Sequence, residues 1–444
     1  MTRWFSASSA TAAALFPFGA GSGAPRAGIP VGRHLFWDEV VHVDPFAWLT
    51  EGLTTNPGMF QLGQPGTGKS AFAKRQLLGM VADGIRPVVL GDPKGEYAAL
   101  VQRLGGDVVQ IGGGRSINPL DIPGEPQDVR GQRLSLVMAL CGLVRGSRGL
   151  SSGEQVVLAA ALDELRDPTL SGLLQEIQQP TREVRAAAGV ATTAAYEAVT
   201  QELRWTLDLL LRGPLRGVLD GRAQRSLNLQ APAVAVDLSA IDDEHVLAAA
   251  MICAWSWGRA AVAAESQRVP GSRWLLVIDE LWRTLRGAPG LVDHLDAITR
   301  LNRSRGIASL MVTHSLQDLE ALPDPADVAK AMGFIDRSGI VVLSGLPRRE
   351  LDVVGSVVPL TEKEKELVAS WSAAHRWREG GVHPGRGRYL IKAGHRPGLP
   401  VVMRLTDFEQ RLYDTDPRPS RPSTPGQPPL ADAQMRLAAE AFGR

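Results

Sequence analysis

Short apolar runs alternate with longer helical stretches along most of the 444-residue chain. The short runs are rich in β-branched residues, as buried strands are, whereas the longer stretches repeat their apolar positions every three or four residues. This alternation predicts an α/β fold with a mostly parallel sheet. The expected strands lie at 59–62, 87–91, 107–111, 233–238, 274–279, 307–313, 339–343, 388–392 and 400–404.

The strand pattern is interrupted between residues 126 and 230. Stretches such as GEQVVLAAALDEL and YEAVTQELRWTLDLLL have the helical period, which predicts an inserted all-helical subdomain. Residues 417–429 contain six prolines, a composition typical of a linker, and the final ADAQMRLAAEAF favours a short helix. We therefore expect a lead-in segment (1–52), a first core part (53–125), the helical insertion (126–230), a second core part (231–416) and a proline-rich tail (417–444).

Net charge, lysine and cysteine content and the lengths of the apolar runs limit the classes of protein to which this chain can belong. The formal net charge is +1, so bulk charge favours neither nucleic acid nor an anionic membrane surface. Only seven of the 48 basic residues are lysines, so a lysine inside a motif carries more weight. Cys141 and Cys253 lie in apolar stretches and are expected to be buried, without a disulfide framework. With no secretion signal and no apolar run of the roughly 18 residues that a membrane span needs, a cytoplasmic protein without an integral membrane segment is predicted.

A phosphate-binding loop is the strongest chemical signal. GQPGTGKS, at 63–70, matches GxxxxGK[ST] between an apolar run and a helical stretch, the context that this motif requires. Its glycines let backbone N–H groups surround phosphate oxygens, and the following helix directs its positive end at the same anion. Lys69 is expected to reach the β- and γ-phosphates and Ser70 to ligate Mg²⁺. The nucleotide-binding residues expected here are Gly63, Gln64, Pro65, Gly66, Thr67, Gly68, Lys69, Ser70 and Ala71.

Two carboxylates follow the apolar run WLLVI. Asp279 and Glu280 are expected at the carboxyl end of a central strand, where α/β sheets place their ligands. Asp279 would hold the Mg²⁺ shell, and Glu280 would orient and polarise the attacking water as general base. Together with the phosphate loop, this pair predicts an ATPase that uses ATP and Mg²⁺.

A third segment, GDPKGEY at 91–97, directly follows the second expected strand. Asp92, Lys94 and Glu96 would then lie at the same edge of the sheet as the phosphate loop. We expect them to contribute to nucleotide binding, in a role that the sequence leaves undetermined. A plain turn is the alternative, because DPxG is turn chemistry.

Further candidates surround the strand expected at 307–313. His314 follows it, at a position from which the γ-phosphate can be sensed, although an ordinary strand-to-loop transition would look the same. Arg303 and Arg305 precede it and are candidate arginine fingers, acting within one subunit or across an interface. A solvated helix end is the alternative for the arginines.

In combination, these motifs resemble one family. GQPGTGKS, GDPKGEY, INPLD at 117–121, VIDELWR and VTHSLQDL occur in this order in the ATPases of conjugative type IV secretion, and the set is most similar to the VirB-four/TraC/TrbE class of the HerA–FtsK superfamily. The resemblance covers about residues 10–416. It implies a RecA-like P-loop NTPase core in a motor that energises apparatus assembly or substrate transfer. It also implies self-assembly, with a hexamer favoured, inner-membrane secretion-complex proteins as partners, and a place at the inner face of the cell membrane.

Two features depart from that class. Its members carry a large N-terminal domain, whereas almost nothing precedes the ATPase lead-in here, which suggests a split or truncated version. The sensor position is commonly Gln and is His314 in this chain. A neutral imidazole can still donate a hydrogen bond to phosphate.

Two other functions remain open. A DNA pump of the HerA–FtsK or coupling-protein type has the same catalytic parts, with DNA as substrate, and needs basic loops that grip the phosphates. A nucleotide-binding scaffold that hydrolyses little is the second alternative, and the intact phosphate loop and carboxylate pair argue against it. The basic candidates for DNA contact are Arg222, Arg225, Arg348, Arg349, Arg386 and Arg388.

Overall fold

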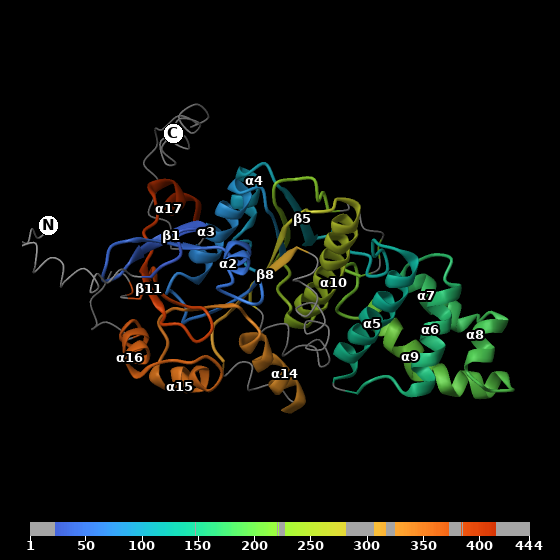
Figure 1. The fold of residues 1–444 in the computed structure, drawn as a ribbon. Helices are drawn as coiled ribbons and strands as arrows, with labels where there is room; N and C mark the ends of the chain where they lie inside the picture. The colour runs from blue at the N-terminus through green and yellow to red at the C-terminus, as the bar shows by residue number, and fades with distance from the viewer. Residues whose placement is uncertain are drawn as a thin grey trace, which may run out of the picture.

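The computed structural model describes residues 23–146, 148–219, 221, 227–280, 306–316, 325–372, 383 and 385–413. Within these residues, eleven strands form one sheet at the centre of the molecule (Figure 1). The strands are β1 (Ile29–His34), β2 (Val40–Val43), β3 (Gly58–Leu62), β4 (Arg86–Asp92), β5 (Asp107–Gly112), β6 (Val234–Ala240), β7 (Trp274–Ile278), β8 (Ile307–Thr313), β9 (Ile340–Leu343), β10 (Arg388–Lys392) and β11 (Leu399–Val402).

The strand order is β2-β1-β11-β10-β9-β3-β8-β7-β4-β6-β5. The seven strands from β9 to β5 pair in parallel, and the other four are added in antiparallel pairing. All parallel strands therefore direct their carboxyl ends to one edge of the sheet. The predicted α/β fold with a mostly parallel sheet is confirmed.

Nine strands match the nine sequence predictions within a few residues, but β1 and β2 were not predicted. Their sequence signal is weak because Pro30 and Gly32 interrupt β1, where the pairing with β2 shifts register. A Cβ at Gly32 would lie 2.5 Å from the carbonyl oxygen of Val402, so glycine allows β1 to approach β11. Strand β1, which lies between β2 and β11, therefore depends on a tertiary contact that local patterning does not reveal.

Helices cover both faces of the sheet. One apolar cluster joins the sheet to α2, α3, α4 and α17, and a larger one joins its other face to α5–α10 and α14–α16. Alternate residues of β3 belong to the two clusters: Met59 packs in the cluster with α2, α3, α4 and α17, and Phe60 packs in the larger cluster on the other face. The helices are α2 (Pro45–Thr50), α3 (Lys69–Ala82), α4 (Ala98–Arg103), α5 (Pro126–Arg145), α6 (Ser152–Glu164), α7 (Leu170–Gln178), α8 (Arg182–Ala187), α9 (Thr193–Arg212), α10 (Glu244–Arg268), α14 (Pro325–Asp336), α15 (Arg348–Val357), α16 (Glu362–Ser370) and α17 (Asp407–Tyr413).

Helices α5 to α9 form the segment between β5 and β6, and in Figure 1 α6 to α9 extend beyond the sheet as a separate lobe. The described part of this segment contains helices and no strand, as the sequence indicates. Ser151 caps α6 in a capping box with Glu154, and Arg145 at the end of α5 donates two hydrogen bonds to that carboxylate. These contacts join α5 to the lobe.

Helix α10 is long and apolar enough to cross a membrane by length and composition, with a mean hydropathy of 1.5 in its most apolar window. However, 89% of that window is buried inside the protein, as in a core helix. Cys253 on α10 and Cys141 on α5 are both buried and free, as predicted. Burial raises the pKa of Cys141 to about 12, so this thiol is inert at neutral pH.

Candidate active site

The phosphate loop connects β3 to α3 at the carboxyl edge of the parallel strands. Gly66 and Gly68 have φ angles of 80° and 96°, a backbone region that favours glycine. Gly68 is the N-cap of α3, so the positive end of this helix faces the loop. A Cβ at Gly63 would lie 1.7 Å from Ser344 Oγ, so only glycine fits against β9's end. The glycines therefore form the cradle that a phosphate group needs.

Residues distant in sequence hold this loop in place. Thr67 Oγ1 lies 2.9 Å from Ser344 Oγ, just beyond β9. The Gly387 N–H donates to the Thr67 carbonyl at 3.1 Å, and the Tyr389 hydroxyl donates to the Gly68 carbonyl at 2.7 Å. Residues next to β9 and on and before β10 thus support the phosphate loop.

Lys69 points into the loop. Its Nζ donates to the carbonyl oxygens of Gly63, at 2.6 Å, and Gln64, at 3.1 Å. Burial lowers the pKa of Lys69 to about 8, and the negative charges of Asp279 and Glu280 oppose this shift. The ammonium group therefore lies between the loop and the two carboxylates.

Asp279 and Glu280 follow the buried strand β7, as predicted. Asp279 Oδ2 accepts from the Tyr97 hydroxyl at 2.7 Å, and Oδ1 accepts from the Glu280 N–H at 2.8 Å. Burial raises the pKa of Asp279, and the Tyr97 hydrogen bond counteracts part of that effect. The Asp279 carboxylate is thus held in a fixed position, and Ser70 is the second residue of α3. Carboxylate and hydroxyl oxygens are hard donors of the kind that Mg²⁺ prefers.

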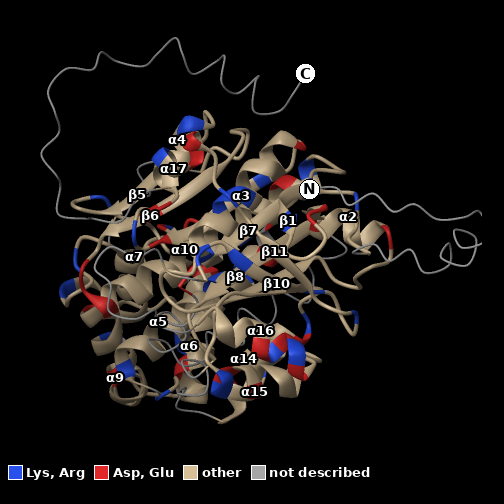
Figure 2. Cartoon of the chain, turned by 90° about the vertical axis from the view of Figure 1, so that its left-hand side faces the viewer, with Lys and Arg blue, Asp and Glu red and all other residues tan. Residues whose placement is uncertain are grey.

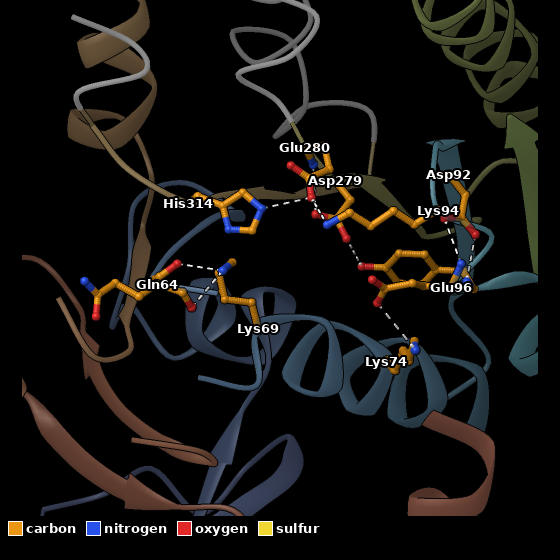
Figure 3. Close-up of polar contacts among 11 residues, drawn as sticks. Gln64, Lys69, Lys74, Asp92, Lys94, Glu96, Asp279, Glu280 and His314 are labelled. Carbon is orange, nitrogen blue, oxygen red and sulfur yellow. Dashed lines mark hydrogen bonds and ion pairs between the residues drawn. The ribbon is translucent and has the colours of Figure 1, made fainter. Parts of the chain in front are cut away.

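Glu280 is held by two side chains from neighbouring strand ends (Figure 3). Its Oε1 accepts from His314 Nε2 at 2.9 Å and forms an ion pair with Lys94. Burial alone would raise the pKa of Glu280, but the hydrogen bonds from His314 and Lys94 outweigh it and hold the pKa at about 2. An ionised carboxylate only accepts hydrogen bonds, so His314 Nε2 is the donor. The backbone of Glu280 has φ of 52°, a strained conformation for a residue with a Cβ.

The GDPKGEY segment forms the turn between β4 and α4. The buried Asp92 carboxylate accepts from the backbone N–H groups of Glu96, at 2.9 Å, and Tyr97, at 2.7 Å. The Glu96 side chain pairs with Lys74 of α3 at 3.7 Å. Of the three residues predicted to bind nucleotide here, Lys94 is the one whose side chain contacts Glu280. Asp92 and Glu96 support the turn that presents it.

The structure therefore brings the phosphate loop, Asp279, Glu280, Lys94 and His314 together at one edge of the sheet. Arg303 and Arg305, the candidate arginine fingers, lie outside the described residues. Sequence reasoning missed three residues that position the site, namely Tyr97, Ser344 and Tyr389. The one available signal was that Tyr97 ends the GDPKGEY motif and that a buried tyrosine hydroxyl normally has a partner.

The whole fold was compared with solved structures. VirB4 of Thermoanaerobacter pseudethanolicus superposes with a TM-score of 0.69 at 21% sequence identity, over 87% of this chain and 99% of that one. The chain shares its fold with VirB4. The plasmid coupling protein TrwB in complex with the ATP analogue ADPNP matches with a TM-score of 0.56 at 16% identity, over 86% of this chain and 91% of that one. TrwB in complex with ADP and Mg²⁺ matches with a TM-score of 0.54 at 17% identity, over 79% and 86%.

No protein-family profile and no curated protein sequence matches the chain. The likeness to VirB4 and TrwB is therefore a likeness of fold. It confirms the predicted fold of the core, and it is consistent with the resemblance that the motifs carry.

Proposed function

We propose that this protein is an ATP-hydrolysing motor of a conjugative or type IV secretion apparatus, which energises apparatus assembly or substrate transfer. The observation that carries the proposal is the meeting of the phosphate loop with Asp279 and Glu280 at one sheet edge. This constellation lies in a fold that matches VirB4 over nearly the whole of that chain.

ATP and Mg²⁺ are the proposed ligands, and TrwB has been solved with ADPNP and with ADP and Mg²⁺. The loop glycines and Lys69 would bind the phosphates, while Ser70 and Asp279 would hold the metal. Mg²⁺ supplies charge neutralisation at the β- and γ-phosphates when bound. Glu280, which is ionised at neutral pH, would orient the attacking water and accept its proton.

The proposed assembly is a homo-oligomer, with a hexamer favoured, that docks on inner-membrane secretion-complex proteins from the cytoplasmic side. The division of the chain into a lead-in, a two-part core, a helical insertion and a tail is part of the same proposal. Helices α5–α9 have the secondary structure expected of the insertion, since the described part of 126–212 contains helices and no strand.

A DNA pump is the second candidate, because the conjugative coupling protein TrwB has the same fold with a TM-score of 0.54. Of the basic candidates, Arg348 is paired with Glu362 and Asp352, whereas Arg386 and Arg388 are exposed. Arg222 and Arg225 lie outside the described residues. Basic and acidic residues both occur across the side shown in Figure 2, and the formal net charge of +1 favours a protein substrate over DNA.

The decisive experiment measures phosphate release from ATP by the wild type and by Glu280→Gln, with and without single- and double-stranded DNA. We expect Mg²⁺-dependent turnover that falls ~10²–10⁴-fold in Glu280→Gln, because the general base is lost, while ATP binding is retained. The matched control, Glu51→Gln at an exposed position, should behave as wild type. Turnover of the wild type no higher than that of Glu280→Gln would favour the scaffold function, and stimulation by DNA at moderate salt would favour the DNA pump.

A further inference from the structure

Lys94 and Glu280 are 186 residues apart, yet they form an ion pair at the sheet edge. Lys94 follows β4 and Glu280 follows β7, and these two strands pair in parallel, so their carboxyl ends lie side by side. The Lys94 side chain is 47% exposed, whereas that of Glu280 is 5% exposed. A flexible, solvent-accessible lysine therefore binds the buried carboxylate that the proposed reaction uses as its base.

The same lysine acts electrostatically on the phosphate loop. The positive charge of Lys94 contributes to lowering the pKa of Lys69, after the larger effect of burial. The two ammonium groups approach the Asp279–Glu280 pair from different elements, Lys69 from the phosphate loop and Lys94 from the β4 turn (Figure 3). These like charges repel each other, and a polyanion bound close to both would relieve the repulsion.

We propose that Lys94 exchanges partners during the ATPase cycle, which rests on the proposed function. Without a γ-phosphate, Lys94 binds Glu280. With ATP bound, its ammonium group donates to a γ-phosphate oxygen, and the Glu280 carboxylate is released to orient the attacking water. ADP lacks this oxygen, so the Lys94–Glu280 ion pair persists in the ADP state.

The chemistry of the two partners supports this exchange. A terminal phosphate carries more negative charge than a carboxylate and offers three acceptor oxygens, so it competes well for an ammonium group. Lys94 and His314 both donate to Oε1 of Glu280. After Lys94 leaves, the His314 hydrogen bond to this atom would keep the carboxylate in place. The strained backbone of Glu280, with φ of 52°, fits a residue whose position is fixed by its surroundings.

A purely structural ion pair makes a different prediction. A lysine that only stabilises the fold would affect the binding of ADP and of an ATP analogue alike. A lysine that contacts the γ-phosphate affects only the nucleotide that carries this group. The ratio of the two affinities therefore separates the two roles.

The test measures the affinities of Mg²⁺–ADPNP and Mg²⁺–ADP by calorimetry, together with kcat and KM for ATP. We expect Lys94→Met to weaken ADPNP binding by about tenfold, to leave ADP binding within about twofold and to lower kcat, since a charge-assisted hydrogen bond to phosphate is lost. Lys94→Arg, which keeps the charge, should restore most of the preference for ADPNP. Lys363→Met, at an exposed position on α16, serves as the matched control and should match wild type.

An equal loss of both affinities, an unchanged ratio, or tighter ADPNP binding in Lys94→Met would each overturn the partner exchange. These binding readouts do not depend on turnover. If the wild type binds nucleotide with the expected Lys94 dependence but hydrolyses nothing, the γ-phosphate contact stands and the motor function fails. If it binds neither nucleotide, both are overturned.

Discussion

At the scale of single residues, Asp92 determines how the β4 turn presents Lys94 and Tyr97. Its buried carboxylate accepts two backbone N–H groups of the turn, so one side chain fixes the path of the chain over five residues. Tyr97 then reaches Asp279 with its hydroxyl, and Lys94 reaches Glu280. Asp92, which the sequence predicts to contribute to nucleotide binding, thus also shapes the turn.

The pH dependence of stability should report this role of Asp92. Burial raises its pKa from 3.8 to about 6, against the opposing backbone hydrogen bonds, and the charges of Asp279 and Asp237 add to the rise. Folding therefore takes up a proton between these pH values. The protonated Asp92 side chain therefore stabilises the folded protein most below about pH 4. As the pH rises through 6, this stabilisation is lost, which lowers the free energy of unfolding by about 2–3 kcal/mol.

We expect Asp92→Asn to lack this loss. Urea unfolding from pH 4 to pH 7.5 measures the free energy of unfolding of both proteins. As the pH rises, the value for wild type should fall relative to that for Asp92→Asn. Lys74 also interacts electrostatically with Asp92. Because Lys74 is present in both proteins, its own effect on stability largely cancels in the comparison. Asp83→Asn, at the exposed end of α3, should keep the wild-type profile. Parallel profiles for wild type and Asp92→Asn would refute this assignment.

At the scale of secondary structure, strand β4 needs α10 to complete its hydrogen bonding. The pairing of β4 with β6 shifts register between Val89 and Asp92, and Gly91 has φ of 93°. The Leu90 carbonyl accepts instead from the Trp255 Nε1–H at 2.6 Å. This bend turns the end of β4 toward the active site, and a buried helix supplies the hydrogen bond for it.

Trp255→Phe should therefore destabilise the protein by about 1–3 kcal/mol, because it leaves a buried carbonyl without its donor and opens a small cavity. Denaturant unfolding measures the change in free energy of unfolding. Trp205→Phe on α9 is the matched control, since Trp205 is 60% exposed and its replacement should stay within about 0.5 kcal/mol of wild type. Equal effects of the two substitutions would contradict the role given to Trp255.

At the scale of the whole molecule, the site lies at one edge of the sheet, and the α6–α9 lobe extends beyond that sheet (Figure 1). In the proposed motor, this edge would have to respond to a neighbouring subunit. Arg303 and Arg305 are the candidate arginine fingers, which could act within one subunit or across an interface. Their contribution can be tested by mixing subunits.

If one of these arginines acts across an interface, its alanine variant and Glu280→Gln should each be inactive alone and recover a clear fraction of wild-type ATPase activity when mixed. An interface is complete where the arginine variant supplies Glu280 and its Glu280→Gln neighbour supplies the arginine, whereas the reverse interface lacks both groups. Mixing Lys69→Ala with Glu280→Gln is the control and should restore nothing, because no site in that mixture is complete. Failure of both arginine variants to complement would place the finger within one subunit or remove the role altogether.

The sequence predicted the parallel core and the phosphate loop because both depend on local patterns. A buried parallel strand is a continuous apolar run, and the loop GQPGTGKS is a contiguous segment whose glycines are required by the backbone. The prediction failed for β1 and β2, where Gly32 fits against Val402, 370 residues away. It also missed Ser344 and Tyr389, because nothing local marks a side chain that supports a distant loop. For Tyr97, the one local signal was its place at the end of GDPKGEY.

By itself, then, the sequence determined the class of the fold, the residues of the phosphate loop and the carboxylate pair that follows β7. Only the tertiary structure decided which residues meet. The ion pair of Lys94 with Glu280, the hydrogen bond of Tyr97 with Asp279 and the contact of Ser344 with the loop all join strand ends that are distant along the chain. The physical reason is that side-by-side placement at a sheet edge follows from strand order, and strand order is set by packing of the whole domain.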